Sequence, residues 1–226
     1  ATEREAPDGW ICLAFSNHDV VRHVSRWATH GQQDAFTRLA AAMLLSMRGS
    51  VCLYQGEELG LTEAELAFED LVDPYGIEFW PQFKGRDGCR TPMVWQAAAH
   101  LGAFSTAPRA WLPVPADHLA RAVDIQQQSN DSVLGLYKAL LRFRRAHPAL
   151  SKGTIELLDM PEGVLGFVRK ESAEALLCVF NMRETPVVAQ LPDGMSPTSI
   201  GFPLEATAPA GGAVSLGPFG AFVGAV

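Results

Sequence analysis

Three adjacent polar residues, Asn17, His18 and Asp19, follow an apolar run and have the side chains to act on a hydroxyl-bearing ligand. The run, residues 10–15, has the length of a strand buried on both faces, as in parallel sheets. Polar residues at the carboxyl end of such a strand mark the active face of a parallel barrel. An ionised Asp19 can hold hydroxyls or stabilise positive charge, and His18 can donate a hydrogen bond. The alternative is a cap for the next helix, which the residues alone favour.

The elements around this triplet alternate between strand and helix. Residues 33–47 carry apolar side chains at helical spacing, and Gly49 is the expected stop. A second apolar strand, 51–54, again ends in polar residues, so the order predicts a right-handed, parallel βαβ unit. Residues 56–131 are expected to form a long irregular loop of functional importance. Residues 132–147 predict a helix with basic residues in its C-terminal half.

The pattern changes after residue 150. Short β-rich segments separated by turn signals follow at 154–158, 164–170, 175–181 and 187–191. We therefore predict the C-terminal part of a (β/α)8 barrel over 1–150 and an all-β sandwich domain over 151–226. A whole barrel needs about 250 residues, so this interpretation requires further strands before Ala1. Residues 1–9 and the Ala/Gly/Pro run at 206–213 are expected to be loops.

Composition narrows the class of protein. The 226 residues carry a net charge of −7, which argues against nucleic acid as a partner. No stretch has the roughly 18 uncharged apolar residues of a membrane span. The four cysteines form no CxxC pair, so zinc is not expected, and the residues imply no other metal or cofactor. Cys12 and Cys52 lie in apolar runs and are expected in the core. A cytoplasmic location is the simpler expectation, with the periplasm as the alternative.

Three stretches resemble, in the same order, signatures of glycoside hydrolase family 13, the α-amylase family. They are FSNHD at 15–19, LYQGEELG at 53–60 and GRDGCRTPMVW at 85–95. The first two resemble the ends of barrel strands seven and eight. The third is typical of the α-glucosidase and oligo-1,6-glucosidase branch. The resemblance covers essentially the whole chain and implies the C-terminal portion of a TIM barrel followed by a β-sandwich domain.

The resemblance implies roles for three residues. Asp19 matches the third catalytic carboxylate, which holds hydroxyls of the sugar being cleaved and stabilises the transition state. His18 matches a histidine that hydrogen-bonds the same sugar, and Arg86 an arginine that contacts it and pairs with the carboxylate. An arginine fork can bind a carboxylate and a hydroxyl together. The nucleophile and the acid/base of a retaining enzyme would lie upstream, so this chain alone is predicted to be inactive. Its exposed sheet edge would make it fold poorly.

Other polar and aromatic residues have more than one interpretation. Arg22 and Glu63 are the remaining candidates for contact with substrate. For Arg22, together with Arg26 on the same helix face, a structural salt bridge is favoured, whereas Glu63 could reach a neighbouring sugar unit. Glu57 and Glu58 are expected to support the loop or pair with arginines. The aromatic residues Trp80, Phe83 and Trp95 could stack on sugar rings, but packing within the long loop is the favoured interpretation. Surface or loop positions are expected for His30, His100, His118 and His147.

The leading hypothesis is therefore part of a retaining α-glucosidase acting on short α-linked glucosides such as maltose, isomaltose or sucrose. Transglycosylation could use the same covalent intermediate. The partners would be the small glucoside and the missing N-terminal half of the barrel, with no nucleic acid and no membrane. Trehalose- and sucrose-converting relatives are alternatives. A non-catalytic partner subunit, or a sugar-binding module that uses the aromatic loop at 80–111, is the alternative from another class.

Overall fold

The computed structural model of the chain describes residue 5, residues 9–204 and residues 210–226. Most of the loop expected at 1–9 and the first half of that expected at 206–213 lie outside the described residues, and the second half is a turn that leads into a strand beginning at Ala213. The chain divides into two compact units. Unit 1 comprises Ala1–Leu13, Arg38–Cys52 and Leu136–Val226, and unit 2 comprises Ala14–Thr37 and Leu53–Gly135. The expected division at residue 150 stays a prediction.

A short parallel pair of strands lies in unit 1. Strand β1 (Cys12–Leu13) pairs with β2 (Ser50–Val51), and Cys12 faces Ser50 in the register. Helix α3 (Gln33–Ser46) lies between them in sequence, so the strand–helix–strand order agrees with the predicted βαβ unit. Both strands are shorter than predicted. Among the described residues, β1 and β2 form a sheet of two strands, and each strand extends only as far as the other offers it a hydrogen-bonding partner.

The Arg144 side chain donates hydrogen bonds to backbone carbonyls at the C-terminal end of α3 and just beyond it. Arg144, on α7 (Val133–Ala146), donates from Nη1 to Leu45 O at 2.7 Å and to Met47 O at 3.0 Å, and from Nη2 to Gly49 O at 2.8 Å. The last carbonyls of a helix have no partner within it, so these bonds fix where the helix ends. Gly49 has φ +132°, and a Cβ there would lie 2.7 Å from Ile11 O, so only glycine fits.

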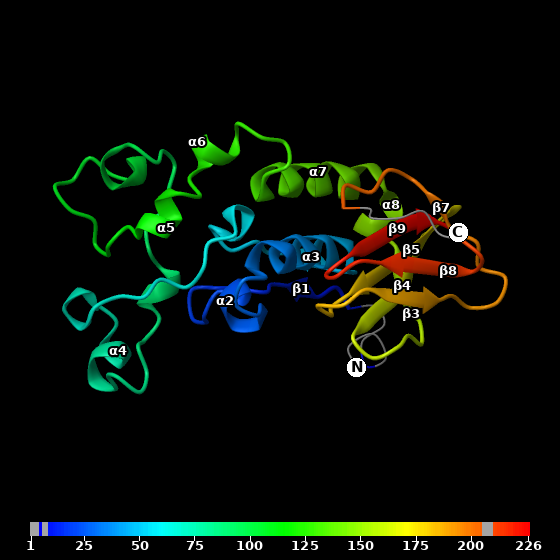
Figure 1. Cartoon of the computed structure of the whole chain (residues 1–226), viewed down its shortest axis with the longest axis horizontal. Helices are drawn as coiled ribbons and strands as arrows, with labels where there is room; N and C mark the ends of the chain where they lie inside the picture. The colour runs from blue at the N-terminus through cyan, green and yellow to red at the C-terminus, as the bar shows by residue number, and fades with distance from the viewer. Residues whose placement is uncertain (1–4, 6–8, 205–209) are drawn as a thin grey trace. The chain divides into compact units, whose positions relative to one another are not determined.

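The C-terminal part of unit 1 is antiparallel β-structure (Figure 1). The larger sheet has five strands in the order β3 (Thr154–Leu157), β4 (Val164–Glu171), β5 (Glu174–Asn181), β9 (Ala221–Ala225) and β7 (Thr198–Ser199). The smaller sheet pairs β6 (Val187–Gln190) with β8 (Ala213–Leu216). Val168, Leu177 and Phe222 of the larger sheet share one buried cluster with Ala189 and Val214 of the smaller. Short helix α8 (Pro148–Ser151) contacts β4 and β5. The predicted strands are confirmed, and the sandwich stays a prediction.

Unit 2 holds α2 (His23–Trp27) and much of the segment expected to be irregular. Seven short helices interrupt that segment, a difference from the sequence prediction. They are η1 (Glu57–Leu59), η2 (Phe68–Asp70), α4 (Pro74–Glu78), η3 (Asp87–Cys89), η4 (His100–Ala103), α5 (Ala116–Leu119) and α6 (Val123–Gln126). Apolar side chains of the helices and of the loops between them, among them Leu59, Leu61 and Val94, form a small buried cluster. Helices of three to five residues carry too little periodicity to be recognised in a sequence.

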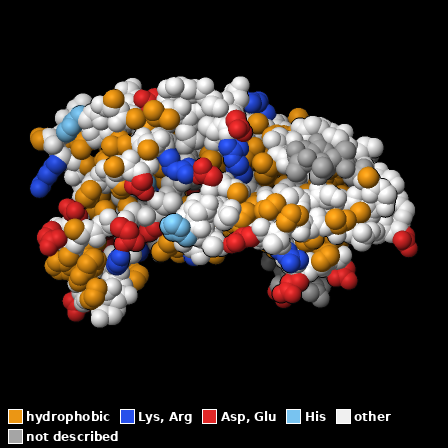
Figure 2. Space-filling model, viewed as in Figure 1, with side chains coloured by type: hydrophobic (Ala, Val, Ile, Leu, Met, Phe, Trp, Pro, Cys, Tyr) orange, Lys and Arg blue, Asp and Glu red, His pale blue; other side chains and the backbone are white. Residues whose placement is uncertain are grey.

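The surface mixes side chains of all kinds. On the face drawn in Figure 2, acidic and basic side chains are interspersed with hydrophobic ones. Across the described ranges, none of the helices combines the length and the hydropathy that crossing a bilayer requires.

Candidate active site

Asp19 is the centre of a charged cluster in unit 2. Its Oδ1 accepts hydrogen bonds from Arg86 Nη1 at 3.1 Å and from Arg90 Nη2 at 3.0 Å. Its Oδ2 lies 3.2 Å from His18 Nε2. The Asp19 side chain is 49% exposed and that of His18 is 70% exposed, so both can reach a ligand. The structure thus brings together the three residues for which the resemblance implies a role.

A buried carboxylate, Asp73, holds Arg86 in place. Arg86 donates from Nε to Asp73 Oδ2 and from Nη2 to Asp73 Oδ1, both at 2.9 Å, and its backbone N–H donates to Oδ2 at 2.8 Å. Hydrogen bonds from the Arg86 side chain keep the pKa of Asp73 well below its usual range, and they raise the pKa of Arg86. Gly85 has φ +77°, and a Cβ there would lie 2.9 Å from Asp73 Oδ2. The close approach therefore requires glycine.

Asp87 fixes the backbone that carries Asp73. Its buried Oδ2 accepts from Val72 N at 2.7 Å and from Asp73 N at 2.8 Å. Asp73 in turn caps the short helix α4, because its Oδ1 accepts from Tyr75 N at 3.4 Å. The Asp73 carboxylate thus both caps α4 and holds the Arg86 side chain, an arrangement called here the clamp on Arg86. Asp87 fixes the backbone that carries this carboxylate.

Arg90 is a second arginine at Asp19 that sequence reasoning did not single out. Besides its bond to Asp19, it donates from Nε to His18 O at 2.7 Å. Arg90 therefore fixes both the carboxylate and the backbone beside it. The signal was present in the stretch at 85–95, which carries a second arginine four residues after Arg86. Asp73 gave no such signal, because only the fold shows which acid is buried against Arg86.

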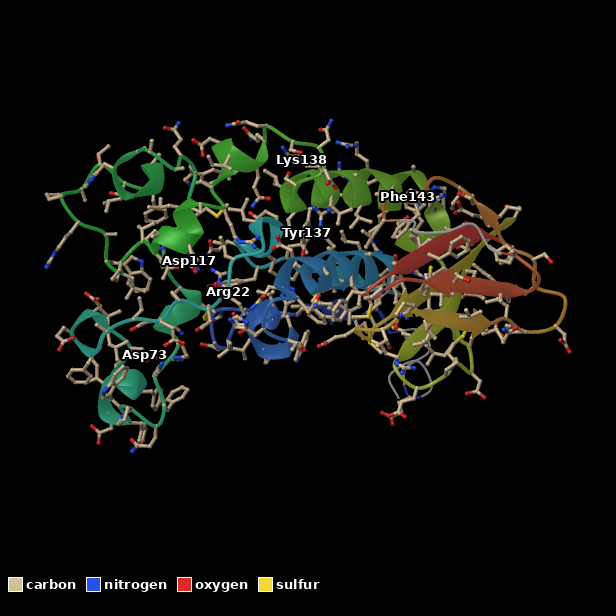
Figure 3. The ribbon with its side chains drawn as sticks, viewed as in Figure 1. Arg22, Asp73, Asp117, Tyr137, Lys138 and Phe143 are labelled. Atoms are coloured by element: carbon tan, nitrogen blue, oxygen red, sulfur yellow. The ribbon has the colours of Figure 1, made fainter. Side chains whose placement is uncertain are left out.

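Arg22, labelled in Figure 3, is buried and connects two loops through hydrogen bonds to their backbone. The salt bridge expected for Arg22 is therefore wrong. Its Nη1 donates to Gln55 O at 2.7 Å and its Nη2 to Cys89 O at 3.0 Å, and no ion pair of Arg22 occurs among the described residues. Tyr54 Oη donates to the same Cys89 oxygen at 3.0 Å, and the Tyr54 ring centre lies 5.2 Å from the Arg22 guanidinium carbon. Burial lowers the pKa of Arg22. With 1% of its surface exposed, Arg22 is placed to join loops and not to touch a ligand.

Glu63 lies at a separate cavity of about 300 Å³, which Ser25, Phe83 and Gly85 also line. Its Oε2 accepts from Arg22 N at 3.0 Å, and its own N–H donates to Ser25 Oγ at 2.7 Å. Burial raises the pKa of Glu63, and the bond from Arg22 N opposes the rise. Glu63 is therefore held by the chain on one side and faces open space on the other.

The loop glutamates take different positions. Glu57 is buried with its Oε1 3.5 Å from His23 Nδ1, whereas Glu58 Oε2 accepts from Gly56 N at 2.8 Å. Glu58 supports the loop, as expected, whereas the Glu57 carboxylate lies beside a histidine of α2 and bonds neither the loop nor an arginine among the described residues. Arg26 donates to Phe15 O at 2.7 Å instead of forming the expected salt bridge, because the carbonyl end of the preceding segment lies within its reach.

Three further expectations need correction. His118 is buried, not on the surface: its Nδ1 lies 3.3 Å from Thr91 Oγ1, its Nε2 lies 3.0 Å from Thr62 O, and burial lowers its pKa. Cys12 and Cys52, expected in the core, are exposed, because a single pair of short strands cannot cover both of its faces.

The aromatic residues of the loop divide into two groups. Trp80 packs with its ring 5.7 Å from that of Phe68, as the packing interpretation expects. Phe83 and Trp95 are 47% and 50% exposed, so their rings remain available to a ligand. Within the described ranges, no group of three or more His, Cys, Asp or Glu residues is arranged to hold a metal ion.

Known proteins match this sequence and this fold. A family model described as the α-amylase catalytic domain matches residues 2–153. The chain is 54% identical over 190 residues to a probable alpha-glucosidase of Rhizobium meliloti (strain 1021), which covers 84% of this chain and 34% of the relative. It is 33% identical over 205 residues to a probable oligo-1,6-glucosidase 2 of Bacillus subtilis (strain 168), which covers 81% of this chain and 36% of that protein.

Solved structures agree. The alpha-glucosyl transfer enzyme XgtA superposes with a TM-score of 0.90 at 48% identity, over 96% of this chain and 40% of that one. A variant of the trehalulose synthase MutB in complex with glucose superposes with a TM-score of 0.82 at 26% identity, over 96% of this chain and 43% of that one. These neighbours are TIM-barrel glycoside hydrolases and their relatives. The chain belongs to the α-amylase family, glycoside hydrolase family 13. It spans about a third of the length of the curated relatives that it matches.

Proposed function

We propose that this chain supplies the sugar-holding part of the active site of a retaining α-glucosidase. The observation that carries the proposal is the placement of Asp19, which two arginines hold by one oxygen while the other lies beside the exposed His18. The relatives named as glucosidases support the substrate class.

The geometry suits an oxocarbenium-like transition state. Arg86 and Arg90 both donate to Oδ1 of Asp19, whereas Oδ2, beside His18 Nε2, could accept from hydroxyls of the sugar being cleaved. A carboxylate fixed before the reaction can stabilise positive charge that develops on the sugar ring without having to reorient. His18 would donate a further hydrogen bond to the same sugar.

The bond-breaking groups are proposed to lie outside this chain. A retaining glycosidase needs a nucleophile and an acid/base about 5 Å apart, and none of the acids here occupies a family position for either role. We propose that barrel strands upstream supply both, that residues 1–150 complete this barrel, and that residues 151–226 form the sandwich domain. The chain alone is then inactive. Its four free cysteines favour a cytoplasmic location, with the periplasm as the alternative.

The neighbouring sugar or acceptor would occupy the cavity at Glu63. Glu63 could accept a hydrogen bond from a hydroxyl there, and the half-exposed Phe83 could stack on the ring. An acceptor other than water would give transglycosylation through the same intermediate. The trehalulose synthases and the α-glucosyl transfer enzyme among the structural neighbours favour considering this outcome together with hydrolysis.

The test compares Asp19→Asn with Asp193→Asn in the whole polypeptide that the gene encodes. Asp193 is an exposed aspartate in a turn of unit 1 and serves as the matched control. On 4-nitrophenyl α-D-glucopyranoside, Asp19→Asn is expected to lower kcat about 10³-fold or more, as loss of a major electrostatic group does, while Asp193→Asn keeps full activity. Binding of maltose without turnover in any of the three proteins would instead favour the sugar-binding or partner-subunit role.

A further inference from the structure

A second cavity of about 450 Å³ lies in unit 2, apart from the charged cluster at Asp19. Two segments form its walls, residues 69–72 and residues 108–114, together with Leu101. None of the residues around Asp19 lines it. Its volume falls in the range of small-molecule sites.

The lining combines three kinds of chemistry. Glu69 and Asp70 supply exposed carboxylates, Arg109 supplies an exposed guanidinium group, and the Trp111 indole is 55% exposed. The floor includes Leu112, which is buried. Exposing the apolar face of an indole to water at a concave surface is unfavourable, and a ligand that covers the ring removes this cost.

These groups select a neutral ligand that is rich in hydroxyls. An anionic ligand would meet two carboxylates and a single cation among the lining residues. A purely apolar ligand would desolvate those carboxylates without giving them hydrogen bonds. A saccharide avoids both costs, since its hydroxyls can bond Glu69, Asp70 and Arg109 while the apolar face of its ring covers Trp111.

The backbone at the cavity is held in an uncommon conformation. Leu101 lines the cavity at φ +51°, in the left-handed region that residues other than glycine rarely adopt. The turn is fixed by Gly102 O, which accepts from Trp95 N at 2.8 Å. Strain of this kind persists only where surrounding contacts enforce it, and it concentrates at ligand sites.

We propose that this cavity is a second saccharide site, distinct from the site at Asp19, with Trp111 as its stacking platform. The wall at 69–72 runs directly into Asp73, and Val72 N donates to Asp87 at 2.7 Å. A sugar bound here would therefore contact the segment that carries the clamp on Arg86.

The test labels the whole encoded polypeptide with 5-fluorotryptophan and follows its ¹⁹F spectrum during titration with maltose and isomaltose. The resonance absent from Trp111→Phe identifies Trp111, and that absent from Trp10→Phe identifies the control, since Trp10 is also half-exposed but does not line the cavity. We expect a saturable shift at Trp111 with a millimolar dissociation constant. Glu69→Gln with Asp70→Asn should weaken sugar binding roughly tenfold, because neutral amide oxygens accept weaker hydrogen bonds than carboxylates.

A further variant separates the two sites. His18→Ala disturbs the site at Asp19 without touching the cavity, so the Trp111 titration should be unchanged. The proposal is overturned if the Trp111 resonance does not move up to about 50 mM sugar, well above such a dissociation constant. It is also overturned if His18→Ala abolishes the shift, which would assign the signal to the site at Asp19. These results are independent of the turnover that tests the proposed function.

Discussion

Arg86 and Asp73 are joined by two side-chain hydrogen bonds of 2.9 Å, from Nε to Oδ2 and from Nη2 to Oδ1, while Nη1 of the same guanidinium group donates to Asp19. Asp73 is buried whereas Asp19 is half-exposed. The buried carboxylate therefore orients the arginine, and the arginine orients the exposed carboxylate. A planar fork with fixed donors is needed to serve both at once.

Replacing Asp73 should damage both stability and the proposed activity. In Asp73→Asn the Arg86 guanidinium loses its buried charged partner and keeps only the half-exposed Asp19. Because Arg86 is itself 29% exposed, we expect a loss of about 2 kcal/mol, the scale of hydrogen bonds to a charged group. Urea denaturation at pH 7 measures the loss, and Asp193→Asn should leave the free energy of unfolding unchanged. An unchanged value for Asp73→Asn would contradict the clamp.

The same pair predicts a pH dependence. Because Arg86 lowers the pKa of Asp73 in the folded state, the pair contributes its full stability above the ordinary aspartate pKa of about 4. This contribution is lost as the pH falls toward the folded-state pKa. The difference in unfolding free energy between the parent and Asp73→Asn should be constant from pH 8 to 5 and shrink toward pH 3. A difference that grew on acidification would have the wrong sign.

Arg90 should contribute to affinity at Asp19 through geometry more than charge. Arg90→Lys keeps the cation but cannot bond both Asp19 Oδ1 and His18 O in the same fork. In the whole encoded polypeptide, we expect kcat/KM on an α-glucoside to fall roughly tenfold. This corresponds to the loss of about one charge-assisted hydrogen bond. Arg142→Lys, at an exposed position on α7, is the matched control. Equal effects of the two substitutions would remove Arg90 from the site.

The contrast between Arg86 and Asp73 shows how far the sequence alone could go. The pairing of Arg86 with Asp19, 67 positions apart, was expected because both lie in stretches with a recognisable pattern. Asp73 lies in a segment of short helices where acids are frequent, and nothing local distinguishes it from Asp70. Only burial and the direction of the Arg86 side chain select it, and both depend on tertiary contacts.

Arg22 should be the most sensitive arginine for the stability of unit 2. Arg22→Lys loses the fork that bonds Gln55 O and Cys89 O, and it leaves buried carbonyls short of donors. A loss of about 2 kcal/mol is expected, measured as a lower midpoint in thermal unfolding. Arg26→Lys, four positions on and exposed, should cost far less. A larger effect at Arg26 would contradict the connector role.

Sequence reasoning misjudged Arg22 for a physical reason. Its spacing from Arg26 suggested one helix face, yet Arg22 precedes α2 and its side chain points into the loops. His118 was misjudged in the same way, since a histidine in a polar segment gives no sign that Thr91 and Thr62 will enclose it. Long helices and buried strands were readable because their patterns repeat.

Cysteine labelling tests the burial pattern and the barrel proposal together. Cys12 and Cys52 are exposed in the chain, whereas Cys89 and Cys178 are buried. Burial raises the pKa of the Cys89 thiol to about 11, so little reactive thiolate exists at pH 7.5. In the native whole encoded polypeptide, iodoacetamide should therefore leave Cys89 unmodified, as peptide mass spectrometry would show. Cys12 and Cys52 should be protected as well, because the proposed neighbouring strands would cover them, whereas unfolding in urea should expose all three. Rapid labelling of Cys12 and Cys52 without urea would argue against a completed barrel, and rapid labelling of Cys89 without urea would contradict the packing around Arg22.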